Sequence, residues 1–65
     1  MAKMLTIREA RQRQGLTQAE IADRVGLSQP AIHYVEVGLL SVRQKDRELW
    51  LEVLKQPAGR VHFPE

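Results

Sequence analysis

Apolar residues recur along this 65-residue chain at spacings of three and four positions, with charged and polar residues between them. Such spacing gathers apolar side chains on one face of a helix and predicts amphipathic helices that pack on a shared core. In the middle of the chain, the side chains expected to face that core are Ile21, Val25, Leu27, Ile32 and Val35. Nearer the C-terminus, the apolar face consists of Leu49, Trp50, Val53 and Leu54, and Leu51 falls outside it.

Two short helices joined by a sharp turn occupy the centre of this pattern. Thr17 and Glu20 have the spacing of a capping box, in which the hydroxyl and the carboxylate each accept a hydrogen bond from the other residue's backbone N–H. Gly26 can adopt a positive φ without a Cβ clash, so it ends the helix that Thr17 begins. Ser28 offers a second N-cap, and Pro30 gives up an N–H that has no helical partner. These signals predict helices over residues 18–25 and 29–37.

The capping-box spacing recurs on either side of this pair. Thr6 with Glu9 begins a helix that Gly15 can end, and Ser41 with Gln44 precedes the second apolar face. The predicted outer helices cover residues 7–14 and 43–55.

The two ends of the chain give weaker signals. Residues 1–5 are expected to form a short arm. Residues 56–65 contain Pro57 and Gly59, which break a helix, followed by three residues of apolar and polar alternation. A disordered tail, a short strand and an arm that packs on a second subunit remain alternatives for this segment.

The stretch GLTQAEIADRVGLSQPAIHYVEVG combines two caps, the small Ala22 four residues before Gly26, and apolar residues at the offsets of a helix-turn-helix. In these features it resembles the phage Cro and repressor (XRE-type) family of DNA-binding proteins, over about residues 5–54. The resemblance implies an all-α fold, a compact four-helix, lambda-repressor-like helix-turn-helix domain over residues 1–55 with a short non-helical tail over residues 56–65. It also implies double-stranded DNA as the partner.

Composition excludes several kinds of site but does not identify the function. Ten Lys and Arg against eight Asp and Glu give a net charge of +2, so any DNA affinity must come from the placement of the cations. The absence of cysteine excludes disulfides and thiolate zinc sites, and two histidines are too few to propose a metal site. No apolar run approaches the ~20 residues that cross a membrane, so we expect a cytoplasmic protein. No catalytic grouping is recognisable, and we predict neither an enzyme nor a bound cofactor.

The exposed face of the helix over residues 29–37 is expected to meet base edges in the major groove. Gln29 is the leading candidate because an amide can both donate to and accept from adenine. The resemblance supports this role, since the matching position is usually a glutamine that packs against one at Gln18. Pro30 replaces a side chain that often binds bases in relatives, so contact there must be apolar. The predicted base-contacting residues are Gln29, Ala31, His33 and Tyr34.

Phosphate contacts are expected at helix starts and after the third helix. Gln18 lies at the positive end of its helix, where a backbone N–H and an amide suit a phosphate oxygen. The predicted phosphate-contacting residues are Thr17, Gln18, Ser28, Arg43 and Lys45. Arg8 is interpreted as part of a solvated face.

Arg11 and Glu36 are predicted to form a structural pair. Glu36 falls in the last turn of its helix, where the helix dipole disfavours a carboxylate unless a cation compensates. In the family that this chain resembles, an arginine at the position of Arg11 pairs with a glutamate at the position of Glu36.

Leu39 and Leu40 stand in the loop where relatives usually carry basic or small polar residues. We expect one of them in the core and the other in a dimer contact; Trp50 and the tail are further candidates for a partner surface. The predicted function is a sequence-specific transcriptional regulator, a repressor, that binds DNA as a homodimer. The alternative is an antitoxin-type or other regulator that uses the same fold to bind a second protein.

Overall fold

Three side-chain caps set where the first three α-helices begin. Thr6 Oγ1 accepts a hydrogen bond from Glu9 N–H at 3.0 Å, and Glu9 Oε1 accepts one from Thr6 N–H at 3.0 Å. Thr17 and Glu20 form the same reciprocal pair at 3.1 and 3.0 Å, and Ser28 Oγ accepts from the N–H three residues on at 3.3 Å. In the computed structural model, which describes residues 4–64, these caps precede α1 (Ile7–Arg13), α2 (Gln18–Val25) and α3 (Gln29–Glu36).

The fourth helix begins differently from the prediction. A 3₁₀ turn, η1 (Gln44–Asp46), leads into α4 (Arg47–Leu54), and neither has a side-chain cap. The expected capping box of Ser41 and Gln44 is therefore wrong. The turn is closed instead through the backbone, because Asp46 N–H donates to Arg43 O at 2.8 Å.

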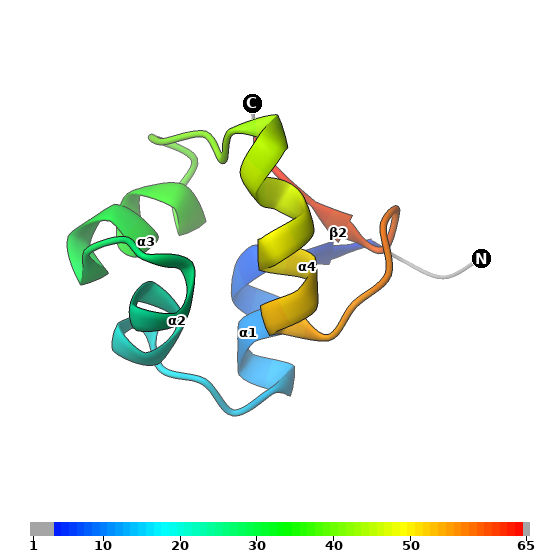
Figure 1. Ribbon diagram of the computed structural model, residues 1–65, viewed down its shortest axis with the longest axis horizontal. Helices are drawn as coiled ribbons and strands as arrows, with labels where there is room; N and C mark the ends of the chain where they lie inside the picture. The colour runs from blue at the N-terminus through cyan, green and yellow to red at the C-terminus, as the bar shows by residue number, and fades with distance from the viewer. Residues whose placement is uncertain (1–3, 65) are drawn as a thin grey trace.

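The helices enclose one core, with α2 and α3 on one side of the molecule (Figure 1). α2 and α3 lie together, α4 stands beside them in the middle of the molecule, and α1 passes behind α4. A small sheet lies on the side of α4 away from α3. Among residues 4–64, no helix has the length and apolar character needed to span a membrane.

Buried apolar side chains from all four α-helices, both strands and the loop residue Val42 form the core. Its members are Leu5, Ile7, Ala10, Ile21, Ala22, Ile32, Val35, Val42, Trp50, Leu54 and Val61. Val25, Leu51, Val53 and Phe63 pack against them while partly exposed.

Two leucines predicted for the core lie at the surface instead. Leu27 and Leu49 are each 42% exposed. Leu27 follows the turn after α2, where the chain has already left the inward face of that helix. On α4 the buried residues are Trp50 and Leu54. Leu51 also packs against the core, although it was predicted to lie outside the apolar face. Leu51 lines the same cavity as Val61 of the small sheet.

The two ends of the described chain pair with each other. β1 (Leu5–Thr6) and β2 (Val61–His62) form a two-stranded parallel sheet in which Leu5 is in register with Val61. Leu5 N–H donates to Arg60 O at 2.7 Å. The expected arm is therefore wrong at Leu5, which is buried in a strand, and residues 1–3 of that arm lie outside the described residues. For the C-terminal segment the structure has the short strand, with Val61 in the same core as the helices.

Candidate nucleic-acid interface

The turn between α2 and α3 fixes how α3 lies on the core. Gly26 adopts φ +76°, and Leu27 N–H donates to Ala22 O at 2.9 Å, which closes the end of α2. Ala22 is buried between the helices, where its small side chain permits a close approach. Ile32 and Val35 bury the inner face of α3. The opposite face of α3 is consequently presented to solvent.

This outer face of α3 brings the candidate base-contacting residues together. Gln29, His33 and Tyr34 are exposed, whereas Ala31 is half-buried. A hollow of about 300 Å³ opens on the face, lined by Gln18, Gln29, Pro30, His33 and Tyr34. The rings of His33 and Tyr34 are tilted by 56° with centroids 5.9 Å apart. The face thus offers an amide, an imidazole and a phenol, all of which can exchange hydrogen bonds with base edges.

A buried network behind this face ties three helices together. Arg11 Nε donates to Glu36 Oε2 at 2.6 Å, and Arg11 Nη2 donates to Glu36 Oε1 at 3.2 Å. Gln18 Nε2 donates to the same Oε1 at 3.1 Å, and Arg11 Nη1 donates to Leu16 O at 2.8 Å. The side chains of Arg11 and Glu36 are only 11% and 4% exposed. These bonds therefore fix the start of α2 and the end of α3 relative to each other and to α1.

This network determines what Gln18 can offer to a ligand. A carboxylate only accepts hydrogen bonds, so the amide must turn its Nε2 toward Glu36 and its Oε1 elsewhere. The backbone N–H of Gln18 lies in the first turn of α2, where it has no intrahelical partner. Sequence reasoning missed the bond between Gln18 and Glu36, because these residues are 18 positions apart and no local signal connects them.

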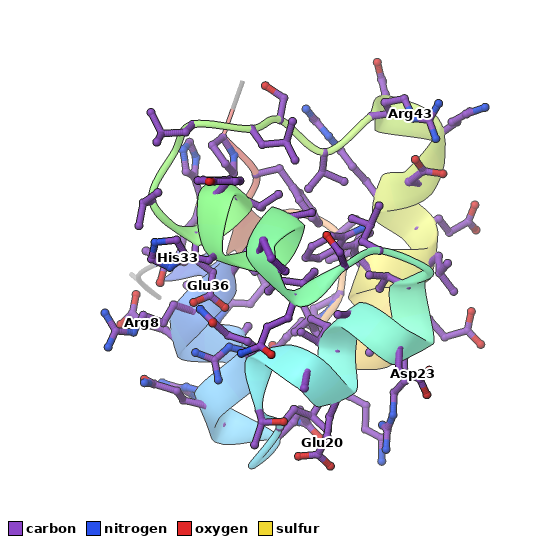
Figure 2. All side chains as sticks on the ribbon, turned by 90° about the vertical axis from the view of Figure 1, so that its left-hand side faces the viewer. Arg8, Glu20, Asp23, His33, Glu36 and Arg43 are labelled. Atoms are coloured by element: carbon purple, nitrogen blue, oxygen red, sulfur yellow. The ribbon has the colours of Figure 1, made fainter. Side chains whose placement is uncertain are left out.

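The charged side chains divide this face into distinct regions (Figure 2). Arg8 and Arg43 lie on opposite sides of the view with α3 between them, while Glu20 and Asp23 lie along α2. The side chain of Arg43 is 73% exposed, and its Nε donates to Asp46 Oδ2 at 3.1 Å. Arg8 and Arg43 therefore lie on either side of α3, and Glu20 and Asp23 lie on one border of its outer face.

Arg8 is exposed, in agreement with its interpretation as part of a solvated face, and it also borders the outer face of α3. It lines a hollow of about 190 Å³ together with Arg11, Gln18, His33, Glu36 and Val37. Its position three residues before Arg11 is the signal that could have indicated this, because such residues share one side of a helix.

The remaining candidate phosphate contacts occupy helix starts. The hydroxyls of Thr17 and Ser28 accept the cap bonds, and the hydroxyl of Ser28 retains an O–H that can donate to a phosphate. Lys45 is exposed on η1 beside Arg43. The pKa of Glu20 is lowered from its ordinary value, first by the hydrogen bond from the Thr17 backbone and then by that from its hydroxyl, so this carboxylate stays ionised at neutral pH.

The residues predicted to contact a protein partner differ in exposure from the prediction. Leu39 and Leu40 are 76% and 44% exposed, so the prediction that one of them fills the core is wrong, and Val42 occupies the core in their place. The chain turns at Gly38, where φ is +83°, directly before these two leucines. Trp50 is 1% exposed and is therefore excluded as a surface for a partner.

A family model described as helix-turn-helix (HTH_3) matches residues 7–56, which include all four α-helices and η1. No curated protein and no solved structure gives a significant match to the chain. The matched region holds the capped α2, the Gly26 turn and the exposed face of α3, and it covers more than half of the sequence. The chain belongs to the XRE/Cro-like helix-turn-helix family, has its lambda-repressor-like fold, and is a DNA-binding domain.

Proposed function

We propose that this protein is a sequence-specific transcriptional repressor that binds double-stranded DNA as a homodimer and reads the major groove with α3. The observation that carries the proposal is the division of α3 into a buried face, Ile32 and Val35, and an exposed face with hydrogen-bonding side chains. An α-helix fits the major groove, where each base pair has a distinct pattern of donors and acceptors.

In this proposal the bases are contacted from the outer face of α3. Gln29 lies nearest the N-terminus of α3 and pairs with an adenine edge, and His33 and Tyr34 extend the contact one turn further along. Ala31 is half-buried, so it offers a thymine methyl only a small apolar contact. Specificity therefore depends chiefly on Gln29.

Phosphates on the two sides of the groove are contacted by different parts of the chain. The backbone N–H of Gln18, with the hydroxyls of Thr17 and Ser28, contacts one strand at the positive ends of α2 and α3. Arg43, directly before η1, and Lys45 within η1 contact the phosphate backbone. In support of this, Arg43 lies to one side of α3 in Figure 2. Such contacts position the protein on the duplex but carry no sequence information.

A homodimer is proposed because one short recognition helix reads too few base pairs to find a site among genomic competitors. The half-sites should lie about one helical turn, ~34 Å, apart. The protein acts where its DNA is, in the cytoplasm of a bacterium or a phage-infected cell, and represses by occupying a promoter.

The proposal is tested by selecting bound sequences from random duplex DNA with the full chain. We expect enrichment of a two-fold symmetric motif, and a promoter that contains this motif should be silenced in a reporter strain that expresses the protein. Selection that enriches no motif, with equal affinity for all duplexes, would contradict sequence-specific recognition.

A further inference from the structure

Arg8 is an exposed cation at the border of the outer face of α3. It lies in the first turn of α1, where the positive end of the helix dipole disfavours a cation. None of the carboxylates of residues 4–64 forms an ion pair with it, whereas Arg43, the arginine on the other side of α3, is paired with Asp46. The charge of Arg8 is therefore unfavourable for its own helix and uncompensated within this part of the chain, which indicates a role in binding.

Arg8 lines the hollow of about 190 Å³ between α1 and α3, which we call the Arg8 hollow, and the walls of this hollow offer several hydrogen-bond donors. Arg11, Gln18 and His33 contribute to them. The carboxylate in the lining, Glu36, is 4% exposed and already accepts bonds from Arg11 and Gln18. Two arginines against one carboxylate, with the histidine neutral, leave the lining with a net positive charge. The Arg8 hollow is therefore suited to an anion.

The Arg8 hollow adjoins the hollow on the outer face of α3. Gln18 and His33 line both of them. Two of the candidate base-contacting side chains, Gln29 and Tyr34, line only the hollow on α3, and Arg8 lines only its own. A helix that lies in the major groove has base edges in front of it and a phosphate strand on each side. The Arg8 hollow therefore lies where the base edges end and one of these strands begins.

The strand in question is the one that the start of α2 approaches. Gln18, the first residue of α2, lines the Arg8 hollow, so the backbone N–H at the start of that helix lies close to it. Figure 2 shows Arg8 and His33 on the same side of α3, and Arg43 on the opposite side. Arg8 thus stands beside the phosphate contact of α2 and across the groove from that of Arg43.

We propose that Arg8 contacts a DNA phosphate next to the one held at the start of α2. The inference rests on the proposed DNA-binding function and adds α1 to the elements that contact the duplex. A guanidinium suits this role because its planar donors can bond two phosphate oxygens at once. A backbone contact strengthens binding to every duplex and adds no sequence preference. It also makes binding more sensitive to salt, because one more counterion is released from the DNA.

The test compares Arg8→Gln with Arg13→Gln in the full chain. Arg13 is also an exposed arginine of α1, but it lies five residues further on, on a different side of the helix, and lines neither of the two hollows. Affinity is measured for the selected site and for a random duplex over a range of salt concentrations. Circular dichroism confirms that each variant is folded.

We expect Arg8→Gln to lower the slope of log affinity against log salt by about 0.9 per subunit on both duplexes. Over a fourfold rise in salt, this difference amounts to about 3.5-fold in affinity per subunit. Arg13→Gln should keep the native slope. The urea midpoint of Arg8→Gln should not fall, because the change removes a cation from the first turn of α1. Equal slopes for the two variants overturn the proposal.

Neutral methylphosphonates, placed one at a time along the duplex, locate the contact. At one position beside the half-site, the native chain should lose affinity on neutralisation of the phosphate, and Arg8→Gln should lose almost none, because its partner group is already gone. Equal losses for the two proteins at every position overturn a direct contact.

Failure of the proposed function gives a different set of results. A native chain that binds the selected and the random duplex equally contradicts sequence-specific repression, but a smaller salt slope for Arg8→Gln still supports the phosphate contact. A clear sequence preference of the native chain, with equal salt slopes for Arg8→Gln and Arg13→Gln, overturns the role of Arg8 and leaves the proposed function intact. A native chain that binds no duplex overturns both.

Discussion

The pair formed by Arg11 and Glu36 should be the most sensitive polar interaction for stability. Its two guanidinium bonds measure 2.6 and 3.2 Å, and the side chains are 11% and 4% exposed. Removing one member of a buried ion pair costs about 3–5 kcal/mol, because the other charge is left without compensation. Arg11→Ala leaves Glu36 with the hydrogen bond from Gln18 alone, so we place its cost near the lower end, about 3 kcal/mol.

A double-mutant cycle separates the interaction from the side effects of each change. Arg11→Ala, Glu36→Ala and the double variant are unfolded in urea, and the free energies of unfolding are compared at unchanged m-value. We expect the double variant to be less destabilised than the sum of the single variants, with a coupling energy of about 1–3 kcal/mol.

The surface pair of Arg43 and Asp46 provides a matched control. It also joins an arginine Nε to a carboxylate, but the two side chains are 73% and 38% exposed. The same cycle on this pair should give a coupling energy below about 1 kcal/mol. Equal coupling in the two pairs, or strict additivity for Arg11 and Glu36, would show that the buried pair does not join α1 to α3.

Three further results are expected. Thr17→Ala and Ser28→Ala should each lower the free energy of unfolding by about 1 kcal/mol, and unchanged urea midpoints would contradict the caps. Gln29→Ala should reduce the binding free energy by about 1–3 kcal/mol on the selected site and by little on random DNA. Arg43→Ala should weaken binding to both DNAs and lower the slope of log affinity against log salt by about one per subunit. Equal loss on both duplexes for Gln29→Ala would mean that α3 does not read bases. Because the pKa of Glu20 is lowered in the folded protein, the ionised carboxylate adds to the free energy of unfolding above the ordinary carboxyl pKa, and this stabilisation is lost as pH falls through the lowered value. If the urea midpoint of Glu20→Gln declined with acid as steeply as that of the native chain, this expectation would be wrong.

Local chemistry explains why much of the helical core could be predicted. Thr17 and Glu20 are three residues apart, so the capping box depends only on the conformation of one turn. Gly26 likewise acts through its own φ, which is +76°. Signals of this kind are complete within a few residues, and the start of α2 and the turn after it follow from them.

Features that depend on distant segments could not be predicted in the same way. Leu51 packs on the core because β2 lies beside it, and nothing near Leu51 in the sequence indicates this. Leu5 looked like part of an arm because its partner, Val61, lies at the other end of the chain. In the candidate interface, the outward face of α3 followed from Ile32 and Val35, whereas the amide of Gln18 was directed by a carboxylate on another helix.

The pairing of β1 with β2 also has a consequence for the order of folding. Leu5 and Val61 meet only after nearly the whole chain has been brought into a closed loop, which carries an entropy cost before the contact is made. The α2–α3 pair needs only local contacts and can form early. Leu5→Ala should therefore accelerate unfolding and leave the refolding rate almost unchanged in a chevron plot, because the sheet is still open in the transition state. A variant that slows refolding by the full loss in stability would show instead that the ends of the chain meet first.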